Sequence, residues 1–246
     1  MESVETKSLY DKIFTRKSVR EFSQRALEPA MLRSIEEQVK AFEAISPILR
    51  VKVVILDQDQ VRGLFKIKAP HYMALYGQSA PGAHLNAGFI LQQMSLWLTA
   101  NGLGSVYQGA CRPKDVVILP TEEELQCMMI LAFGRPQEPL ERSADEFIRK
   151  DMTQIRDFSG ADHLLEAVRL APSAMNGQPW YFTGTAQHIR LWTRKKVFPH
   201  MTQVDMGIAL CHLALAAAHH GGAVEFEVEE ALSQRQKHYV ITAHIR

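Results

Sequence analysis

Two polar runs of the sequence carry residue types that could bind a ligand, and the first reads TRKSVREF at 15–22. In this run Arg16, Lys17 and Arg20 flank Ser18. Two guanidinium groups, an ammonium group and a hydroxyl so close together could clamp a phosphate, because Arg offers a bidentate fork and Ser a short donor. A solvated basic turn would have the same composition, and the spacing alone does not separate the two interpretations.

The second run reads RLAPSAMNGQPW at 169–180. Pro172 disfavours helical geometry in the residue before it, so a helix should end there and the chain should run extended or turned from Ser173 to Gln178. The amides of Asn176 and Gln178 can donate and accept in a fixed geometry, which suits the edge of a planar heterocycle. A plain connector from helix to strand would explain the proline and the glycine, but not the serine and both amides together.

The elements that must position these runs alternate along the chain in two similar series. Apolar residues at helical spacing predict helices, and β-branched runs predict strands. In the first series we expect helices at 5–14, 28–42 and 85–102 and strands at 51–56, 69–77 and 128–134. In the second we expect helices at 162–171 and 204–220 and strands at 180–185, 189–194, 224–230 and 238–245.

The two series also match at the level of single residues. Gly88 and Gly102 bracket the first long apolar helix, Gly207 and Gly221 bracket the second, and the two pairs are offset by 119 positions. Two helices of the same apolar phase could match partly by chance. With the repeated order of elements, however, the match predicts an internal duplication. The expected fold class is α+β, with antiparallel or mixed sheets and long buried helices in two halves, 1–140 and 141–246, that pack as a pseudo-dimer.

Composition limits the classes of partner. The chain has 246 residues, with 28 Lys plus Arg against 27 Asp plus Glu, so no overall positive field attracts a nucleic acid. Cys111, Cys127 and Cys211 form no CxxC pair and have apolar neighbours, which favours buried thiols in a reducing compartment and therefore the cytoplasm. We expect neither nucleic acid nor membrane as a partner.

The N-terminal run, the most apolar run and the histidines bear on three other interpretations: a secreted protein, a membrane protein and a metal protein. The start MESVETKSLYDK does not look like a signal peptide, and the apolar run at 206–218 is shorter than the roughly 20 residues of a membrane span, so we expect a buried helix. His219 and His220 are adjacent and diverge by about 100° on a helix, and no acidic or cysteine cluster completes a metal shell. We therefore expect no metal site.

Three segments together resemble the nitroreductase family of FMN flavoproteins. RKSVREF is similar to its Arg-x-Ser-x-Arg motif, LAPSAMNGQPWYF to its Ala-Pro-Ser-x-x-Asn-x-Gln-Pro-Trp motif, and NGLGSVYQG to its Gly-Leu-Gly segment. In the usual member the first two motifs lie about one helix apart, whereas Ser18 and Ser173 are 155 residues apart here. Members are typically intertwined homodimers in which these two loops, from different subunits, meet around one flavin. The chain therefore resembles the divergent branch in which one fused chain mimics the dimer, with one complete FMN site between the two halves.

The resemblance implies a role for each motif residue. The residues expected to hold the FMN phosphate and ribityl chain are Arg16, Lys17, Ser18 and Arg20, with Arg135 or Arg142 as a further phosphate ligand. The residues expected to line the flavin from the other half are Pro172, Ser173, Ala174 and Asn176, with Gln178 orienting their loop.

Two further groups are expected near the flavin ring. Backbone N–H groups around Gln108 and Gly109 would point towards flavin N5. A basic side chain near N1 and O2 would stabilise the reduced ring, and Lys66 or Lys68 lies in the expected segment. A solvated charge is the competing interpretation for either lysine.

The function implied is an FMN-dependent oxidoreductase that takes a hydride from NADH or NADPH and passes it to a small-molecule acceptor, a nitroaromatic or a quinone by default. No side chain is assigned as catalytic, because the flavin carries the redox chemistry. Two alternatives remain: another reaction of the same family, such as reductive dehalogenation or flavin cleavage, and a non-enzymatic FMN-binding or redox-sensing protein. The chain could act as a monomeric pseudo-dimer or form a homodimer.

Overall fold

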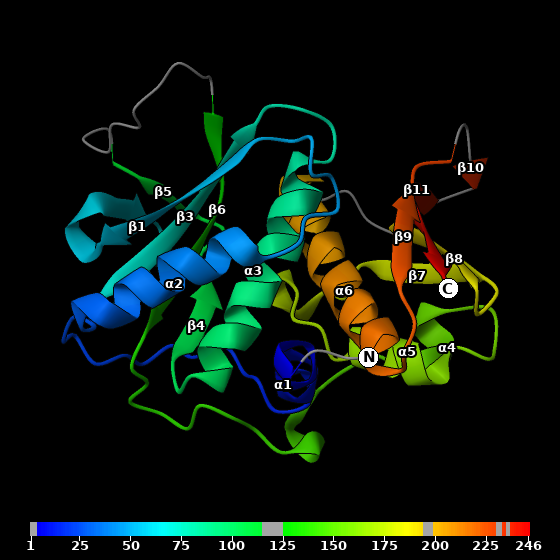
Figure 1. Cartoon of the computed structure of the whole chain (residues 1–246), viewed down its shortest axis with the longest axis horizontal. Helices are drawn as coiled ribbons and strands as arrows, with labels where there is room; N and C mark the ends of the chain where they lie inside the picture. Colours follow the sequence, from blue (N-terminus) through cyan, green and yellow to red (C-terminus); the bar gives the residue numbers. More distant parts are fainter. Residues whose placement is uncertain (1–3, 115–124, 194–198, 230–232, 235–236) are drawn as a thin grey trace.

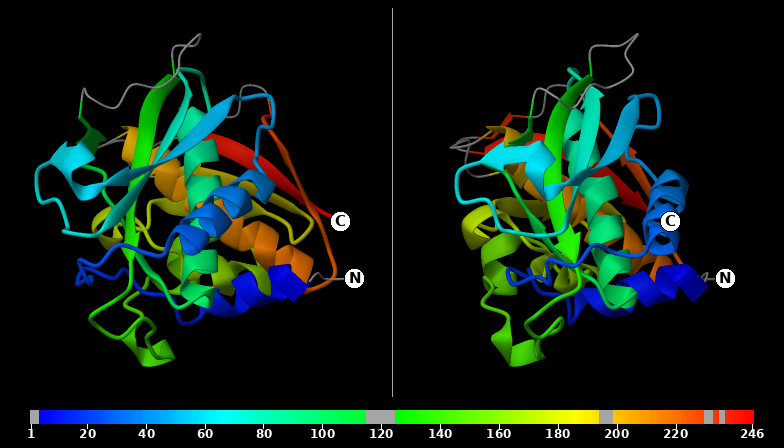
Figure 2. Two further views of the ribbon diagram at one scale, coloured as in Figure 1. Left: turned by 60° about the vertical axis from the view of Figure 1, so that its left-hand side comes forward. Right: turned by 90° about the vertical axis from the view of Figure 1, so that its left-hand side faces the viewer.

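The computed structural model describes residues 4–114, 125–193, 199–229, 233–234 and 237–246. Two antiparallel sheets flank a central pair of long helices (Figures 1 and 2). The first sheet has the order β1 (Val51–Asp57), β3 (His71–Gln78), β6 (Leu125–Gly134) and β4 (Gly104–Tyr107). The second runs β7 (Trp180–Gly184), β8 (His188–Thr193) and β11 (Lys237–Ile245), and both β9 (Val224–Glu227) and β10 (Ser233–Gln234) pair with β11.

The helices and the short elements complete the fold. The helices are α1 (Val4–Ile13), α2 (Pro29–Ala41), α3 (Ala83–Ala100), α4 (Met152–Ile155), α5 (Asp162–Arg169) and α6 (Pro199–His219). The 3-10 turns are η1 (Gln58–Gln60), η2 (Ala144–Glu146) and η3 (Ala174–Asn176), and β2 (Val61–Gly63) pairs with β5 (Cys111–Pro113). The predicted α+β class, with antiparallel sheets and long buried helices, is confirmed.

Most of the expected elements are present, and the differences have local causes. α6 begins five residues before the expected start, because Pro199 is well suited to the first turn of a helix. The four-residue strand β4 was not predicted, since its residues form a strand only by pairing with β6. The strands expected at 189–194 and 224–230 end at Thr193 and Glu227, and their last residues, 194 and 230, lie outside the described part of the chain.

The two sheets have the same topology. Within each four-strand series, β1–β3–β4–β6 and β7–β8–β9–β11, the sheet order places the first strand beside the second, the second beside the last, and the last beside the third. An internal duplication would produce this identity. The duplication itself and the boundary between 1–140 and 141–246 stay predictions.

The contact between α3 and α6 is related in the same way. A Cβ on Gly88 would lie 2.1 Å from the carbonyl oxygen of Val204, and a Cβ on Gly207 would lie 1.9 Å from that of Leu85. Both the glycines and the residues that they meet are 119 positions apart. The missing side chains let the two helix backbones touch, and the apolar core formed around this crossing includes residues of both sheets.

α6 is a core helix, although it is long and apolar enough to cross a membrane, because 72% of that apolar window is buried inside the protein. His212 ties it to its neighbours: its Nδ1–H donates to Ala167 O over 2.7 Å, and its Nε2 accepts from Gln92 Nε2 over 2.8 Å. Burial lowers the pKa of His212 to about 3, so the ring is neutral. Among the described residues no group of three or more His, Cys, Asp or Glu could hold a metal ion.

Candidate functional site

Two adjoining cavities lie where the segment after α1, β4, the segment 138–149, the loop 172–178 and α6 meet. The polar cavity has a volume of about 430 Å³ and the apolar one about 210 Å³. Five residues line both: Ser18, Arg20, Pro172, Ser173 and Met175. The combined site is therefore cationic at one end and apolar at the other, and its size is typical of a cofactor pocket.

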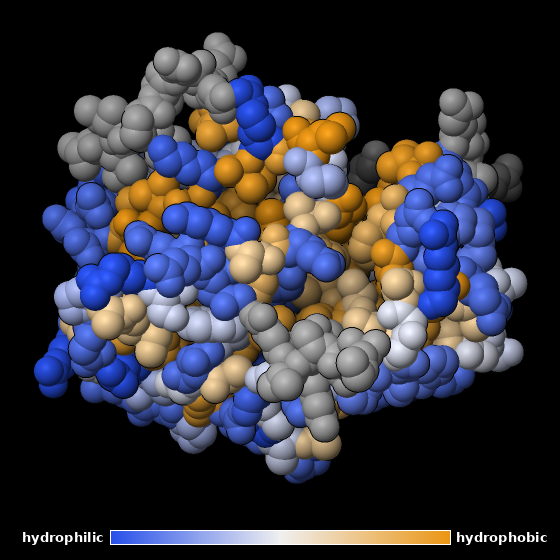
Figure 3. All heavy atoms as spheres, in the orientation of Figure 1, coloured by the Kyte–Doolittle hydropathy of each residue, from blue (hydrophilic) through white to orange (hydrophobic). Residues whose placement is uncertain are grey.

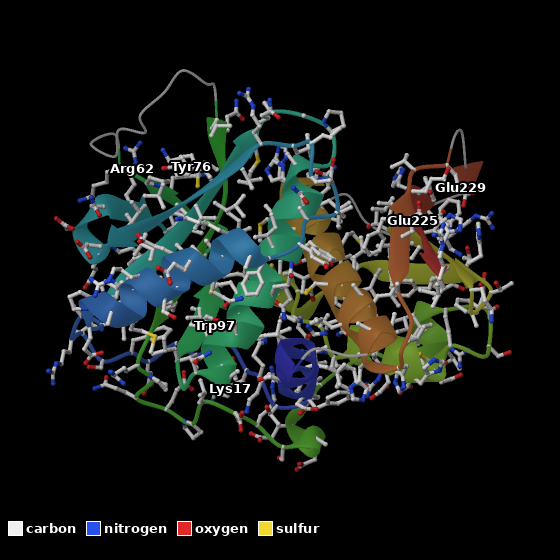
Figure 4. The ribbon with its side chains drawn as sticks, in the orientation of Figure 1. Lys17, Arg62, Tyr76, Trp97, Glu225 and Glu229 are labelled. Carbon is white, nitrogen blue, oxygen red and sulfur yellow. The ribbon has the colours of Figure 1, made fainter. Side chains whose placement is uncertain are left out.

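The polar cavity contains a buried cation. Arg16 is 3% exposed, and its guanidinium donates to Lys17 O over 3.1 Å. Burial, with the neighbouring Arg142 as the next cause, lowers the pKa of Arg16 to about 9. No carboxylate forms a salt bridge with Arg16 within the described ranges, whereas Lys17, labelled in Figure 4 on the segment that follows α1, pairs with Glu138 at 2.9 Å. A buried, unpaired guanidinium is costly unless an anion joins it.

Two more arginines line the same cavity. Arg142 lies between β6 and η2, and Arg149 lies between η2 and α4. Arg142 donates through Nε to Arg16 O over 3.2 Å, and its guanidinium lies 4.2 Å from the ring centroid of Phe147. Arg149 donates to Leu170 O over 3.1 Å, while its Nε is buried without a hydrogen-bond partner. Burial lowers the pKa of Arg149 to about 10. The cavity is lined by five cationic side chains, Arg16, Lys17, Arg20, Arg142 and Arg149, against two carboxylates, Glu138 and Glu146, so its net charge is positive.

The apolar cavity could hold a flat ring. Its apolar walls come from β4, β6 and α6, and include Val106, Tyr107, Met129, Val204 and Ile208. Tyr107 turns its hydroxyl away to donate to Gln92 Oε1 over 3.1 Å. Gly109 also lines the cavity, and a Cβ there would lie 2.9 Å from Met201 Cε. Met201 lines the same cavity, so an added Cβ would push this flexible side chain from its place in the wall.

The loop that follows Pro172 is held in a strained shape. Met175, Asn176 and Gln178 have φ angles of 51°, 53° and 45°, in the left-handed region that non-glycine residues rarely adopt. Such positions persist only where their surroundings enforce them, and they concentrate at functional sites. A hydrogen bond within the loop joins its two ends: Ser173 Oγ accepts from Gln178 N over 2.9 Å.

The segment 148–150 provides the enforcing contacts. Asn176 donates to Ile148 O over 2.9 Å and accepts from Arg149 over 3.0 Å. Gln178 Oε1 accepts from the backbone N–H of Lys150 over 2.8 Å. Both amides therefore brace the loop in the structure, which agrees with the orienting role expected for Gln178 and gives Asn176 a similar one.

Most of the expected site residues meet at the two cavities. Those that line one or both are Arg16, Lys17, Ser18, Arg20, Gly109, Pro172, Ser173, Ala174 and Asn176, together with Arg142. The pairing of two motifs 155 residues apart is therefore present in the structure.

Five of the expected residues line neither cavity: Gln178, which braces the loop, and Arg135, Lys66, Lys68 and Gln108. Arg135 pairs with Glu28 at 2.7 Å on the surface, and Lys68 is exposed; neither lines the cavities. Lys66, the alternative, donates to two backbone carbonyls of its own loop. The backbone N–H of Gln108 donates to Ile130 O over 2.8 Å, which corrects the expectation that it points to the flavin. This bond continues the pairing of β4 with β6 by one residue, and it occupies the donor. The sequence motif alone does not show it.

Four charged residues of the site were not predicted from the sequence: Glu138, Glu146 and Arg149 in the polar cavity and Asp205 in the apolar one. Arg149 lies in a run, FIRKDMTQIR, that shows no family motif. Asp205 lines the apolar cavity and is only 6% exposed. A single acidic residue in an otherwise apolar helical run was the available signal, because an unpaired carboxylate is rarely buried without a function.

Comparison with known proteins confirms the expected nitroreductase-like fold. Residues 8–217 match the sequence profile of the family described as "Putative TM nitroreductase". A solved structure described as a putative nitroreductase from Thermotoga maritima MSB8 is 21% identical, with a TM-score of 0.63, and the match covers 96% of this chain and 92% of that one. Curated proteins give no significant match.

Smaller structures match only part of the chain. A nitroreductase family protein from Clostridium difficile 630 is 18% identical with a TM-score of 0.47, and the match covers 65% of this chain and 99% of that one. Iodotyrosine deiodinase, solved with FMN and 3-iodo-L-tyrosine, is 22% identical with a TM-score of 0.39, and covers 53% and 91% of the two chains.

Proposed function

Because the chain belongs to the nitroreductase family whose profile matches residues 8–217, we propose that it is an FMN-dependent oxidoreductase that uses NADH or NADPH to reduce a nitroaromatic or a quinone. Membership supports an oxidoreductase. The observation that carries the finer proposal is the joined pair of cavities, cationic at one end and apolar at the other.

The residues present fit FMN. Its phosphate is a dianion. The polar cavity offers Arg16, which forms no salt bridge with a described carboxylate, and Arg149, whose buried Nε has no hydrogen-bond partner among the described residues. Guanidinium groups bind phosphate strongly because they donate in a fixed planar fork. The apolar cavity beside them suits the isoalloxazine ring. Ser18 and Ser173 line both cavities and would contact the ribityl chain between the two ends.

When bound, FMN would supply hydride transfer through N5 between the nicotinamide and the acceptor. The chain's own residues would bind and orient the groups. The arginines fix the phosphate end, and the braced loop at 172–178 and α6 define the plane available to the ring. The apolar walls exclude water from it. We place the protein in the cytoplasm, where NADH and NADPH are available and where free thiols such as Cys111 and Cys211 stay reduced.

FMN affinity of the Arg16→Ala protein tests the proposal. Charge-assisted hydrogen bonds contribute about 1.5–3 kcal/mol, so we expect FMN to bind about 10- to 100-fold more weakly. Riboflavin, which lacks the phosphate, should bind the wild type weakly and be indifferent to the substitution. Fluorescence titration of FMN measures both.

Arg135→Ala is the matched control, because Arg135 is a surface arginine that lines neither cavity. Its FMN affinity should stay within about threefold of the wild type. Equal losses in both variants, or no FMN binding at all, would contradict the proposed site. Oxidation of NADH or NADPH by the FMN-loaded protein on addition of a quinone separates an enzyme from a non-catalytic FMN-binding protein.

A further inference from the structure

Asp205 is a buried carboxyl group in the wall of the apolar cavity. It lies in the second turn of α6 and is 6% exposed. Its Oδ1 accepts from the backbone N–H of Ala174 over 3.0 Å. No arginine, lysine or histidine of the described ranges forms a salt bridge with it. A carboxyl group is expensive in such a place, so it needs an explanation beyond packing.

The rest of the chain shows that holding the loop does not require an acid. Asn86 lies 119 positions earlier, on α3, and its Oδ1 accepts from the backbone N–H of Ser46 over 3.3 Å. An amide therefore makes the same helix-to-loop bond on the other side of the molecule, at no cost of a buried charge. Unlike Asn86, Asp205 faces the cavity that also contains Ser18 and Ser173. The two side chains differ chemically in one respect: the carboxyl group of Asp205 can carry and release a proton, and the amide of Asn86 cannot.

Burial favours the protonated form of Asp205, whereas a nearby cation opposes it. The titratable and charged groups of the packed elements are Tyr107 on β4, Arg16 and Arg20 after α1, and His84 and His200 at the starts of α3 and α6. Burial raises the pKa of Asp205 to about 7, although the bond from Ala174 opposes the shift. A group with this pKa is close to optimal for giving and regaining a proton at neutral pH.

We propose that Asp205 donates the proton that the electron acceptor needs when it takes up a hydride. The proposal rests on the proposed function, in which the hydride comes from NADH or NADPH through FMN. A quinone that receives a hydride on one oxygen needs a proton on the other to become a hydroquinone. The O–H bond of Asp205 breaks, an O–H bond forms on the quinone, and the carboxylate left behind regains a proton from water.

Stopped-flow kinetics of Asp205→Asn, which keeps the acceptor for Ala174 N–H, separate the two half-reactions. Reduction of the FMN-loaded variant by NADH or NADPH needs no proton donor, so its rate should change much less than the rate of reoxidation. Reoxidation by 1,4-benzoquinone should be about 100-fold slower than in the wild type near pH 6. The wild-type reoxidation rate should fall as the pH rises through about 7, whereas the variant should lack this step.

A second readout needs neither FMN nor turnover. Infrared difference spectra of the apo-protein between acidic and alkaline pH should show the carbonyl stretch of one protonated carboxylic acid that titrates near pH 7, and this band should be absent from Asp205→Asn. Asp205→Glu, which keeps the acid, should retain both the band and a pH-dependent reoxidation.

The outcomes distinguish the two proposals. Reoxidation of Asp205→Asn at the wild-type rate and with the wild-type pH profile overturns the role of Asp205 alone. Absence of the infrared band from the wild type overturns it as well, even if the variant binds no FMN. A wild-type protein that binds no FMN overturns the proposed function and, with it, this inference.

Discussion

At the scale of single residues, the site contains buried or partly buried charged groups that form no salt bridge with other described residues. Arg16 and Arg149 lie at the polar end, and Asp205 lies at the apolar end. Desolvation is the largest cause of each pKa shift, and it moves each group towards its neutral form. The arginines destabilise the fold unless an anion binds to them, and the carboxylate of Asp205 does so unless it takes up a proton. This pattern is expected of a binding site and not of a structural ion-pair network.

The pH dependence of stability checks the environment of Asp205 directly. Its pKa is about 7 in the folded apo-protein and near 3.8 when unfolded, so its stabilising contribution is complete below about pH 3.8 and is lost as the pH rises through about 7. This loss amounts to about 4 kcal/mol. We expect the free energy of unfolding of the wild type, relative to that of Asp205→Asn, to fall by this order between about pH 4 and pH 8.

Urea unfolding of both apo-proteins across this range measures the difference, and the subtraction cancels groups such as His212 that titrate in both. A constant difference would mean that Asp205 is solvated in the native protein and that its raised pKa is wrong.

At the scale of elements, a braced loop and a close helix crossing hold the site in place. The segment 148–150 fixes the strained turn at 175–178 through side-chain and backbone bonds. The crossing of α3 and α6 sets the position of Asp205, because Gly207 lies two residues after it and touches Leu85 O. The rigid pair of helices thus fixes one wall of the cavity, and the loop fixes the other.

Gly88→Ala and Gly207→Ala test the helix crossing. An added Cβ would meet a backbone carbonyl oxygen at 2.1 Å or 1.9 Å, and neither helix can move without disturbing the core. We expect each variant to lose about 3 kcal/mol or more of unfolding free energy, measured by urea denaturation of the apo-protein.

Gly77→Ala is the matched control for these variants. Its φ is ordinary, and the nearest atom to an added Cβ is Met128 Cγ, at 3.4 Å in a flexible side chain. Its stability should change by about 1 kcal/mol or less. A similar small effect at Gly88 would show that the helices are farther apart than in the structure.

At the scale of the whole molecule, two positions that the 119-residue offset relates offer unequal ligand sites. A third cavity is lined by Phe42, Glu43 and Phe89, and Phe89 lies 119 positions before Ile208 of the apolar cavity. No arginine or lysine of the described residues lines this third cavity. Figure 3 shows apolar side chains in the hollow between the elements labelled α2 and β9 in Figure 1. A position without cations is not suited to a phosphate dianion.

We therefore predict one FMN per chain. Isothermal titration of the apo-protein with FMN, checked by the flavin absorbance released on denaturation, gives the stoichiometry. Two FMN molecules per chain would contradict the inference that the second position has lost its ligand, and would bring a site at the third cavity back into consideration.

The sequence by itself determined the elements and the two motif loops. Hydrophobic periodicity is a local property, so α2, α3, β1 and β6 could be read directly, and Pro172 marked the end of α5. The repeat of 119 residues and the separated motifs also gave the correct fold class before any coordinates.

Only the tertiary structure decided which groups face the cavities. It brought Arg149 and Asp205 to the site, removed Arg135 to a surface ion pair, and engaged the N–H of Gln108 in strand pairing. These outcomes depend on contacts between residues far apart in the chain. The burial that shifts the pKa of Asp205 is a property of the packed walls around it, and no local pattern of residue types contains it.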